Sequence, residues 1–271
     1  MQTIRLPQSE IEKAMSARPK HIFISGASRG IGEAIARLLG EERHAFTLGA
    51  RSYNKLLGVT MDLGTERAQA VRLDLAEPSS IDEAIAAAES KFGPIDVLIN
   101  NAGINLPTPM DDVSEEARAR FRRVIEVNLI GTFSLAQMAT AHMANGGRVV
   151  FIGSVLSRFG VPGNHAYTAS KHAVMGLVRG MAHELASRGI RVNAVNPGWV
   201  DTAMAHESLQ RQADRTGKTL QQMTNDALAM QPIRRMVKPS EVAAYVKFLI
   251  GPGGDAITGQ GIDISCGSVM V

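Results

Sequence analysis

The chain has 271 residues, of which 45% are hydrophobic and 20% charged, and its formal net charge is +3. This length allows a sizeable core within one domain, and so small a charge without a long basic run argues against nucleic-acid binding. The single cysteine, Cys266, excludes an intramolecular disulfide and fits a reducing compartment.

The first twenty residues mix polar and apolar side chains and end near Pro19, so we expect residues 1–20 to be an extension that precedes the fold. They lack the apolar block of a signal peptide, and no later hydrophobic run has the length of a membrane span. We therefore expect a cytoplasmic protein without membrane contact, folded over residues 21–271.

From His21 onward, short apolar runs alternate with longer segments of helical periodicity. The runs that predict strands are 21–25, 45–48, 70–73, 97–99, 148–152, 191–195 and 261–264. The segments that predict helices include 31–39, 81–91, 115–141, 166–187 and 240–250. This alternation predicts an α/β protein, a single-domain Rossmann fold with a doubly wound parallel sheet of about seven strands and helices on both faces.

Residues 203–231 form a polar stretch with interspersed Leu and Met that ends at Pro232. The stretch is too long for a simple turn, so we expect a helical insertion. We further expect this insertion to act as a lid over the substrate.

A glycine-rich turn follows the first predicted strand and opens the first predicted helix. It has the sequence Ser25-Gly26-Ala27-Ser28-Arg29-Gly30-Ile31-Gly32. Such a turn lets the backbone and the free N–H groups of a helix N-terminus approach a diphosphate. A purely structural turn is the alternative, and the strand–turn–helix context disfavours it. We predict cofactor contacts from Gly26, Ser28, Arg29, Gly30, Ile31 and Gly32.

Charge at the end of the second strand indicates which dinucleotide binds. An NAD site usually places an acidic residue there for the ribose hydroxyls. This chain instead has Arg51, and Arg29 adds a second cation inside the turn. Because guanidinium groups pair well with phosphate, these two residues predict NADP(H) over NAD(H). The alternative is a pair of solvated arginines.

Tyr167 and Lys171 are four residues apart in a predicted helix, with Ser154 thirteen positions upstream. Residues at i and i+4 lie on the same helix face, so a phenol and an ammonium can share one site. A neighbouring ammonium lowers the pKa of a tyrosine, as proton transfer at a carbonyl or alcohol requires. Taken alone, the pair could equally belong to a solvated helix surface.

From His21 to Gly267 the chain resembles the short-chain dehydrogenase/reductase family. The glycine turn is similar to the family's cofactor fingerprint, and Asn100-Asn101-Ala102-Gly103 is similar to its Asn-Asn-Ala-Gly signature. Asn128, Ser154, Tyr167 and Lys171 match its catalytic tetrad in order and spacing. Further cofactor contacts that the resemblance implies are Asp74, Leu75, Asn101, Ala102, Gly103, Tyr167, Lys171, Pro197, Gly198, Val200 and Thr202.

The resemblance also implies roles. Tyr167 would be the general acid for carbonyl reduction, and Lys171 would hold the nicotinamide ribose and lower the tyrosine pKa. Ser154 would donate a hydrogen bond to the substrate oxygen, and Asn128 would orient a water that links Lys171 to solvent. A homotetramer is implied by the resemblance alone.

The substrate is less well determined by the sequence. The chain resembles the branch that holds 3-oxoacyl-thioester reductases, aromatic polyketide ketoreductases and small-alcohol dehydrogenases. Its insertion is also similar to the lid of 3-hydroxybutyrate dehydrogenases, but Leu156 and Asn164 replace the charged residues expected for a small hydroxy acid. We predict a substrate pocket formed by Asn105, Ser154, Leu156, Asn164, Tyr167, Trp199 and Met204, with His165 as a further polar group.

We therefore expect an NADP(H)-dependent oxidoreductase that interconverts a ketone and a secondary alcohol, with a small-molecule or thioester substrate. A small cyclic or aryl alcohol dehydrogenase is the first alternative. A non-catalytic NADP(H)-binding regulator is the second, but such proteins commonly lose tetrad residues. No pattern of His, Cys or acidic residues has the spacing of a metal site, so we expect metal-free hydride chemistry.

Overall fold

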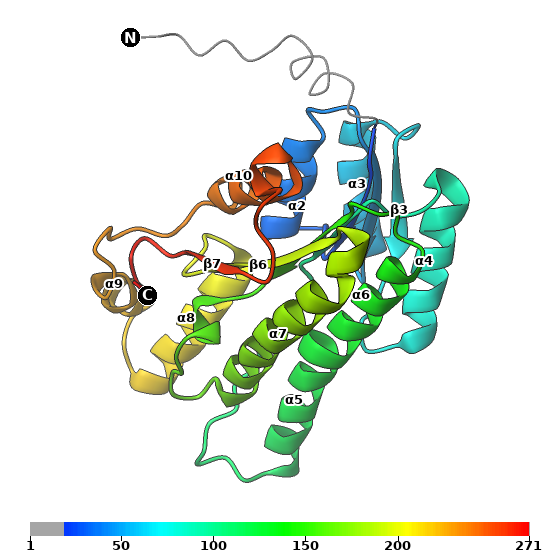
Figure 1. Ribbon diagram of the computed structural model, residues 1–271. Helices are drawn as coiled ribbons and strands as arrows, with labels where there is room; N and C mark the ends of the chain where they lie inside the picture. The colour runs from blue at the N-terminus through cyan, green and yellow to red at the C-terminus, as the bar shows by residue number, and fades with distance from the viewer. Residues whose placement is uncertain (1–18, 271) are drawn as a thin grey trace, which may run out of the picture.

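The computed structural model describes residues 19–270, so most of the expected N-terminal extension lies outside the described residues. Within that part of the chain, seven strands form one parallel sheet in the order β3-β2-β1-β4-β5-β6-β7 (Figure 1). The strands are β1 (His21–Ser25), β2 (Ala45–Ala50), β3 (Ala68–Arg72), β4 (Val97–Asn100), β5 (Arg148–Ile152), β6 (Arg191–Pro197) and β7 (Gly261–Ile264). The predicted doubly wound Rossmann fold is confirmed.

Helices cover both faces of the sheet (Figure 1). On one face lie α2 (Gly30–Leu39), α3 (Tyr53–Leu63) and α10 (Pro239–Ile250). On the other lie α4 (Pro78–Phe92), α5 (Glu115–Ile125), the π-helical segment η1 (Glu126–Gly131), α6 (Thr132–Ala141) and α7 (His165–Glu184). The middle of strand β1 is continuously apolar because both faces of the sheet are covered: Ile22 and Ile24 pack into the first core, whereas Phe23 packs into the second, and all three are fully buried.

Two helical features differ from the sequence-based expectation. Helix α3 was not predicted, since Gly58 interrupts its middle. The segment 115–141 is helical as predicted, but η1 breaks its α-helical geometry where Gly131 passes Leu75: a Cβ on Gly131 would lie 1.8 Å from the Leu75 carbonyl oxygen. Within residues 19–270, Glu115–Ala141 is the one helix whose length and composition would allow a membrane span, but half of its most apolar window is buried inside the protein, as in a core helix.

The order of the strands creates a crevice at one edge of the sheet. Strands β1 and β4 are neighbours, yet the helix after β1 covers one face and the helical segment after β4 covers the other. Ligands of open α/β sheets bind at such a switch point, outside the carboxyl ends of the strands. The glycine turn after β1 and the Asn-Asn-Ala-Gly segment after β4 therefore meet there.

Residues 203–231 contain two helices, α8 (Ala203–Thr216) and α9 (Leu220–Ala229). The hydroxyl of Thr202 caps α8 by accepting a hydrogen bond from Ala205 N at 3.4 Å. The two helices share a small core of their own, formed by Leu209, Ala213 and Met223, which packs against Trp199. Trp199 thus joins the insertion to the end of β6.

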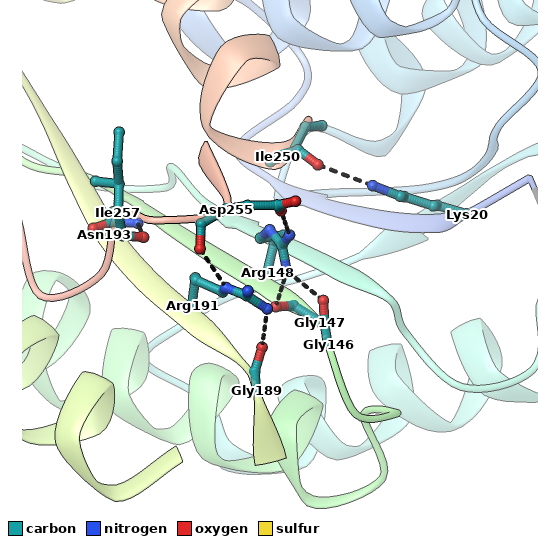
Figure 2. A network of polar contacts seen from close by, with 10 residues as sticks. All are labelled: Lys20, Gly146, Gly147, Arg148, Gly189, Arg191, Asn193, Ile250, Asp255 and Ile257. Atoms are coloured by element: carbon teal, nitrogen blue, oxygen red, sulfur yellow. Dashed lines mark hydrogen bonds and ion pairs between the residues drawn. The ribbon is translucent and has the colours of Figure 1, made fainter. Parts of the chain in front are cut away.

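The opposite end of the sheet is closed by a network of cationic side chains (Figure 2). Lys20 Nζ donates to the carbonyl oxygen of Ile250 at 2.9 Å, and Arg191 Nε donates to the Asp255 carbonyl at 3.0 Å. Arg148 forms an ion pair with the Asp255 carboxylate. Burial lowers the pKa values of Lys20 and Arg148, and a neighbouring cation lowers each further, Arg148 for Lys20 and Arg191 for Arg148. The network fastens the end of α10 to the residue before β1, and the segment before β7 to β5 and β6.

Candidate active site

The glycine turn adopts a backbone that side chains would obstruct. Gly26 and Gly30 have φ values of +68° and +61°, in the left-handed region that favours glycine. A Cβ on Gly32 would lie 2.3 Å from the Gly26 carbonyl oxygen. Asn101 holds the turn in place, because its Nδ2 donates to the Ser25 carbonyl at 2.9 Å and to the Gly26 carbonyl at 3.1 Å. Backbone N–H groups at the start of α2 are thereby left open to a diphosphate.

Three cations lie around this turn. Arg29 precedes α2, and Arg51 follows β2, as the sequence predicts. The third is Lys55 in α3, which lines the same pocket as Arg29 and Arg51. None of the three side chains forms a hydrogen bond or an ion pair with another described residue. Lys55 is not among the predicted residues, because the helix that carries it was not predicted from the sequence.

Asp74 directly follows β3 and lines the pocket with its neighbours Leu73 and Leu75. Its carboxylate accepts a hydrogen bond from Ala76 N at 3.0 Å and lies 3.3 Å from a guanidinium nitrogen of Arg123. The carboxylate is thus held in position at the pocket wall.

Asn128 lies in the π-helical segment η1 and is almost fully buried. Its Nδ2 donates to the Ile104 carbonyl at 2.9 Å and to Ser170 Oγ at 3.2 Å, while its Oδ1 accepts from Ile104 N at 2.8 Å. A Cβ on Gly103 would lie 3.3 Å from Asn128 Oδ1 and 3.8 Å from Lys171 Nζ. Asn128 and Lys171 therefore approach the same glycine, and π-helical segments often carry such functional residues.

Ser154, Tyr167 and Lys171 meet beside the carboxyl end of β5. The Ser154 hydroxyl accepts a hydrogen bond from Leu156 N at 3.1 Å and is hydrogen-bonded to Tyr167. Lys171 Nζ donates to the Ile152 carbonyl at 2.8 Å and lies 5.5 Å from the centre of the Tyr167 ring. The structure thus brings the four predicted tetrad residues to one end of α7.

Burial dominates the acid–base properties of this pair. It raises the pKa of Tyr167 to about 12, although the hydrogen bond with Ser154 acts in the opposite direction. It lowers the pKa of Lys171 to about 8. The expected lowering of the tyrosine pKa is therefore wrong for this arrangement, because burial of the phenol sets the direction of the shift. The ammonium of Lys171 is directed at the Ile152 carbonyl.

The remaining predicted cofactor residues follow β6. Pro197, Gly198, Val200 and Thr202 all line the pocket. A Cβ on Gly198 would lie 3.1 Å from the Cα of Ser265, so this turn packs tightly on the segment after β7. The predicted contacts from both halves of the fold thus lie around one pocket, except Gly32, which packs against Gly26 and Asn101 and does not line it.

The pocket has a volume of about 940 Å³. All predicted substrate residues line it, namely Asn105, Ser154, Leu156, Asn164, Tyr167, Trp199 and Met204. His165 does not: it is exposed and lines a separate surface groove on the other side of α7. The insertion adds residues that the sequence analysis did not predict, namely Ser208, Gln212, Met223, Asp226, Ala227, Met230 and Gln231.

Within residues 19–270, no group of three or more His, Cys, Asp and Glu side chains could hold a metal ion. A serine hydroxyl, a tyrosine and a lysine beside a dinucleotide cradle can position a carbonyl oxygen and give it a proton.

Comparison with known proteins identifies the family. The short-chain dehydrogenase/reductase model described as Enoyl-(Acyl carrier protein) reductase matches residues 26–268. The chain belongs to the short-chain dehydrogenase/reductase family. It is therefore an oxidoreductase that acts on CH–OH groups with a nicotinamide cofactor.

Two relatives and one solved structure illustrate the similarity. The 3-oxoacyl-(acyl-carrier-protein) reductase FabG of Vibrio cholerae is 33% identical over 259 residues, which cover 95% of this chain and 100% of that protein. The putative ketoacyl reductase of Streptomyces coelicolor is 36% identical over 91% of this chain and 95% of its own length. The structure of actinorhodin polyketide ketoreductase with NADPH has a TM-score of 0.85 and 34% identity, covering 91% of this chain and 96% of that one.

Proposed function

We propose that this oxidoreductase is an NADP(H)-dependent ketoreductase that reduces the ketone of a 3-oxoacyl or polyketide-like thioester to a secondary alcohol. The observation that carries the proposal is the pocket itself. One end has three unpaired cations, Arg29, Arg51 and Lys55, and the other has Ser154 and Tyr167 under an apolar cover.

The residues at the cationic end fit NADP(H). Gly26, Gly30 and Gly32 have no side chains, and a Cβ at any of them would meet neighbouring atoms. Their absence of side chains allows the close approach of a diphosphate. Arg51 and Lys55 supply the charge that a 2′-phosphate requires. The relatedness to the NADPH-bound ketoreductase supports the same choice. When bound, the nicotinamide supplies or accepts the hydride.

The tetrad positions the carbonyl and supplies the proton. Ser154 donates a hydrogen bond to the substrate oxygen, where negative charge develops during reduction. Tyr167 transfers its phenolic proton to that oxygen, and a pKa of about 12 keeps the phenol protonated at neutral pH. The Lys171 ammonium then stabilises the phenolate, and Asn128 keeps the backbone at Ile104 in place beside it. The carbon receives one hydride and the oxygen one proton, which gives the alcohol.

The lining of the pocket supports a mainly apolar substrate. The pocket that contains Ser154 and Tyr167 is also lined by the apolar side chains of Leu156, Trp199, Met204, Met223 and Met230. Leu156 and Asn164 carry no charge, so the carboxylate of a small hydroxy acid has no cation from these positions. We propose that α8 and α9 act as the lid that covers this substrate, since both contribute residues to the pocket.

We also propose that the protein is a cytoplasmic homotetramer. The family implies the tetramer, and exposed apolar side chains on α5, η1 and α6 support an interface between copies there. They are Phe121, Ile130, Phe133 and Met138, with exposed fractions of 41%, 48%, 39% and 37%. The single cysteine supports a reducing location.

A substrate panel tests the proposed function. Wild-type protein is assayed with NADPH against acetoacetyl thioesters, cyclohexanone and acetophenone. The proposal predicts that kcat/KM for the thioesters is at least about tenfold higher than for either ketone. The reverse order would favour the small-alcohol dehydrogenase. NADPH binding without turnover of any ketone would favour the non-catalytic regulator.

A further inference from the structure

Three side chains of the substrate pocket carry polar atoms without hydrogen-bond partners. Asn105 Oδ1, Gln231 Oε1 and Ser268 Oγ are buried atoms that form no hydrogen bond with any residue of the 19–270 range. All three residues line the pocket that contains Ser154 and Tyr167. Buried polar atoms are normally paired, so three exceptions among the residues that line one pocket point to a ligand.

The orientation of the Gln231 amide is fixed by its surroundings. The side chain is only 2% exposed, and its Nε2 donates to the Ile233 carbonyl at 3.3 Å and to the Arg235 carbonyl at 2.8 Å. Rotating the amide by 180° would bring Oε1 against these two carbonyl oxygens. Gln231 is therefore held as an acceptor whose two amide hydrogens are already used.

Ser268 lies on a second segment that is fastened to the first. Ile233 N donates to the Cys266 carbonyl at 3.2 Å, and Ser268 N donates to the Ser265 carbonyl at 3.1 Å. Gly267 has a φ of +84°, and a Cβ there would lie 2.9 Å from Pro232 Cγ. This tight packing holds Gln231 and Ser268 on rigid backbone at the pocket wall.

From these contacts we propose that Gln231 and Ser268 form a substrate subsite. The inference rests on the proposed function and extends it. The Gln231 carbonyl oxygen can only accept a hydrogen bond, so the group that it binds must carry an O–H or an N–H. The preferred substrate therefore has a hydroxyl or an amide N–H in addition to the reacting ketone. A purely alkyl or aryl ketone would leave these atoms unpaired.

Three probe substrates test the subsite. S-acetoacetyl-N-acetylcysteamine carries an amide N–H, 2-hydroxyethyl acetoacetate carries a hydroxyl, and ethyl acetoacetate carries neither. We expect wild-type kcat/KM with NADPH to be at least about tenfold higher for one of the first two than for the third, since one buried hydrogen bond is worth roughly that factor. The better of the first two identifies the donor.

Variants then locate the effect. Ser268→Ala and Gln231→Met should reduce this preference, measured as the ratio of the kcat/KM values, about tenfold, with the Kd of NADPH retained. Ser157→Ala is the matched control, because Ser157 Oγ is also buried and unpaired but does not line the pocket. Ser268→Ala removes a single oxygen atom, so it remains informative if Gln231→Met fails to fold.

Each contrary result has a distinct meaning. Equal kcat/KM for the three probes, or an unchanged preference in Ser268→Ala, overturns the subsite and leaves the proposed function intact. A weaker Kd of NADPH in the variants also overturns it, since the cofactor would then be the group that pairs with these atoms. No turnover of any probe by the wild type contradicts the proposed function as well.

Discussion

Lys171 Nζ donates a hydrogen bond to the Ile152 carbonyl oxygen at 2.8 Å. This bond connects α7 to the last residue of β5. Ser154 follows Ile152 by two residues, so this bond fixes the lysine relative to the serine. Lys171 is 5% exposed, and burial alone accounts for its lowered pKa, without the opposing effect of a nearby carboxylate. A buried, unpaired cation of this kind benefits catalysis and reduces stability.

Replacing Lys171 by Met should stabilise the protein at pH 7 and abolish ketone reduction. A pKa of about 8, against an ordinary 10.5, means that charging the buried amine costs about 3 kcal/mol. Loss of the bond to Ile152 offsets about 1 kcal/mol of the gain, so we expect a net gain of about 2 kcal/mol in the free energy of unfolding. Urea denaturation of both proteins measures it.

The pH dependence of the difference in the free energy of unfolding between Lys171→Met and the wild type tests whether burial of the charged amine causes it. Between pH 8 and pH 10.5 the unfolded chain keeps the Lys171 proton that the folded chain has lost, so the stability of the wild type rises with pH in this window. The cost is fully present below pH 8. The advantage of Lys171→Met should therefore shrink as pH rises to 10. A constant difference would show that burial of the charge is not its source.

Arg51→Asp should shift the cofactor preference toward NADH. The ratio of KM values for NADPH and NADH should change by roughly 10- to 100-fold, because one charge-assisted contact is worth about 1.5–3 kcal/mol. Lys55→Ala should give a smaller shift in the same direction, since Lys55 lines the same end of the pocket. Steady-state kinetics with both cofactors measures these ratios, and unchanged ratios in both variants would disprove the NADP assignment.

Two glycine-to-alanine substitutions should differ in outcome: one should weaken NADPH binding, and the other should stabilise the fold. Gly32→Ala places a Cβ 2.3 Å from the Gly26 carbonyl oxygen and 2.5 Å from Asn101 Nδ2, so the turn must open and NADPH binding should weaken at least about tenfold. Gly58→Ala adds its Cβ where no atom lies within 4 Å, within α3, and should stabilise the fold by about 0.5–1 kcal/mol. Fluorescence titration and thermal denaturation check the pair. Equal NADPH affinity in Gly32→Ala would contradict the proposed role of the turn.

Much of the fold could be predicted from the sequence because several of its strands are short, continuously apolar runs separated by regular helices. The glycine turn and the spacing of Ser154, Tyr167 and Lys171 are local signals, so they too could be recognised. Helix α3 was not predicted, since Gly58 lies in its middle and glycine disfavours a helix interior. The prediction of the cationic end therefore lacked Lys55.

Other features depend on tertiary packing and have no local signal. The direction of the Tyr167 pKa shift follows from how deeply the phenol is buried, since burial outweighs the effect of the hydrogen bond with Ser154. The faces of α8 and α9 that line the pocket are set by the small core around Leu209. The orientation of the Gln231 amide is set by its hydrogen bond to the Arg235 carbonyl, and the position of that carbonyl is determined only in the folded chain.

The most direct test of the central claim is ketone reduction by Tyr167→Phe, measured with NADPH and the best substrate of the panel. Loss of the general acid should lower kcat by about 10²- to 10⁴-fold, while the Kd of NADPH stays close to that of the wild type. Tyr245→Phe, which removes a hydroxyl from α10, is the control and should retain full activity. A Tyr167→Phe enzyme as active as the wild type would contradict the account.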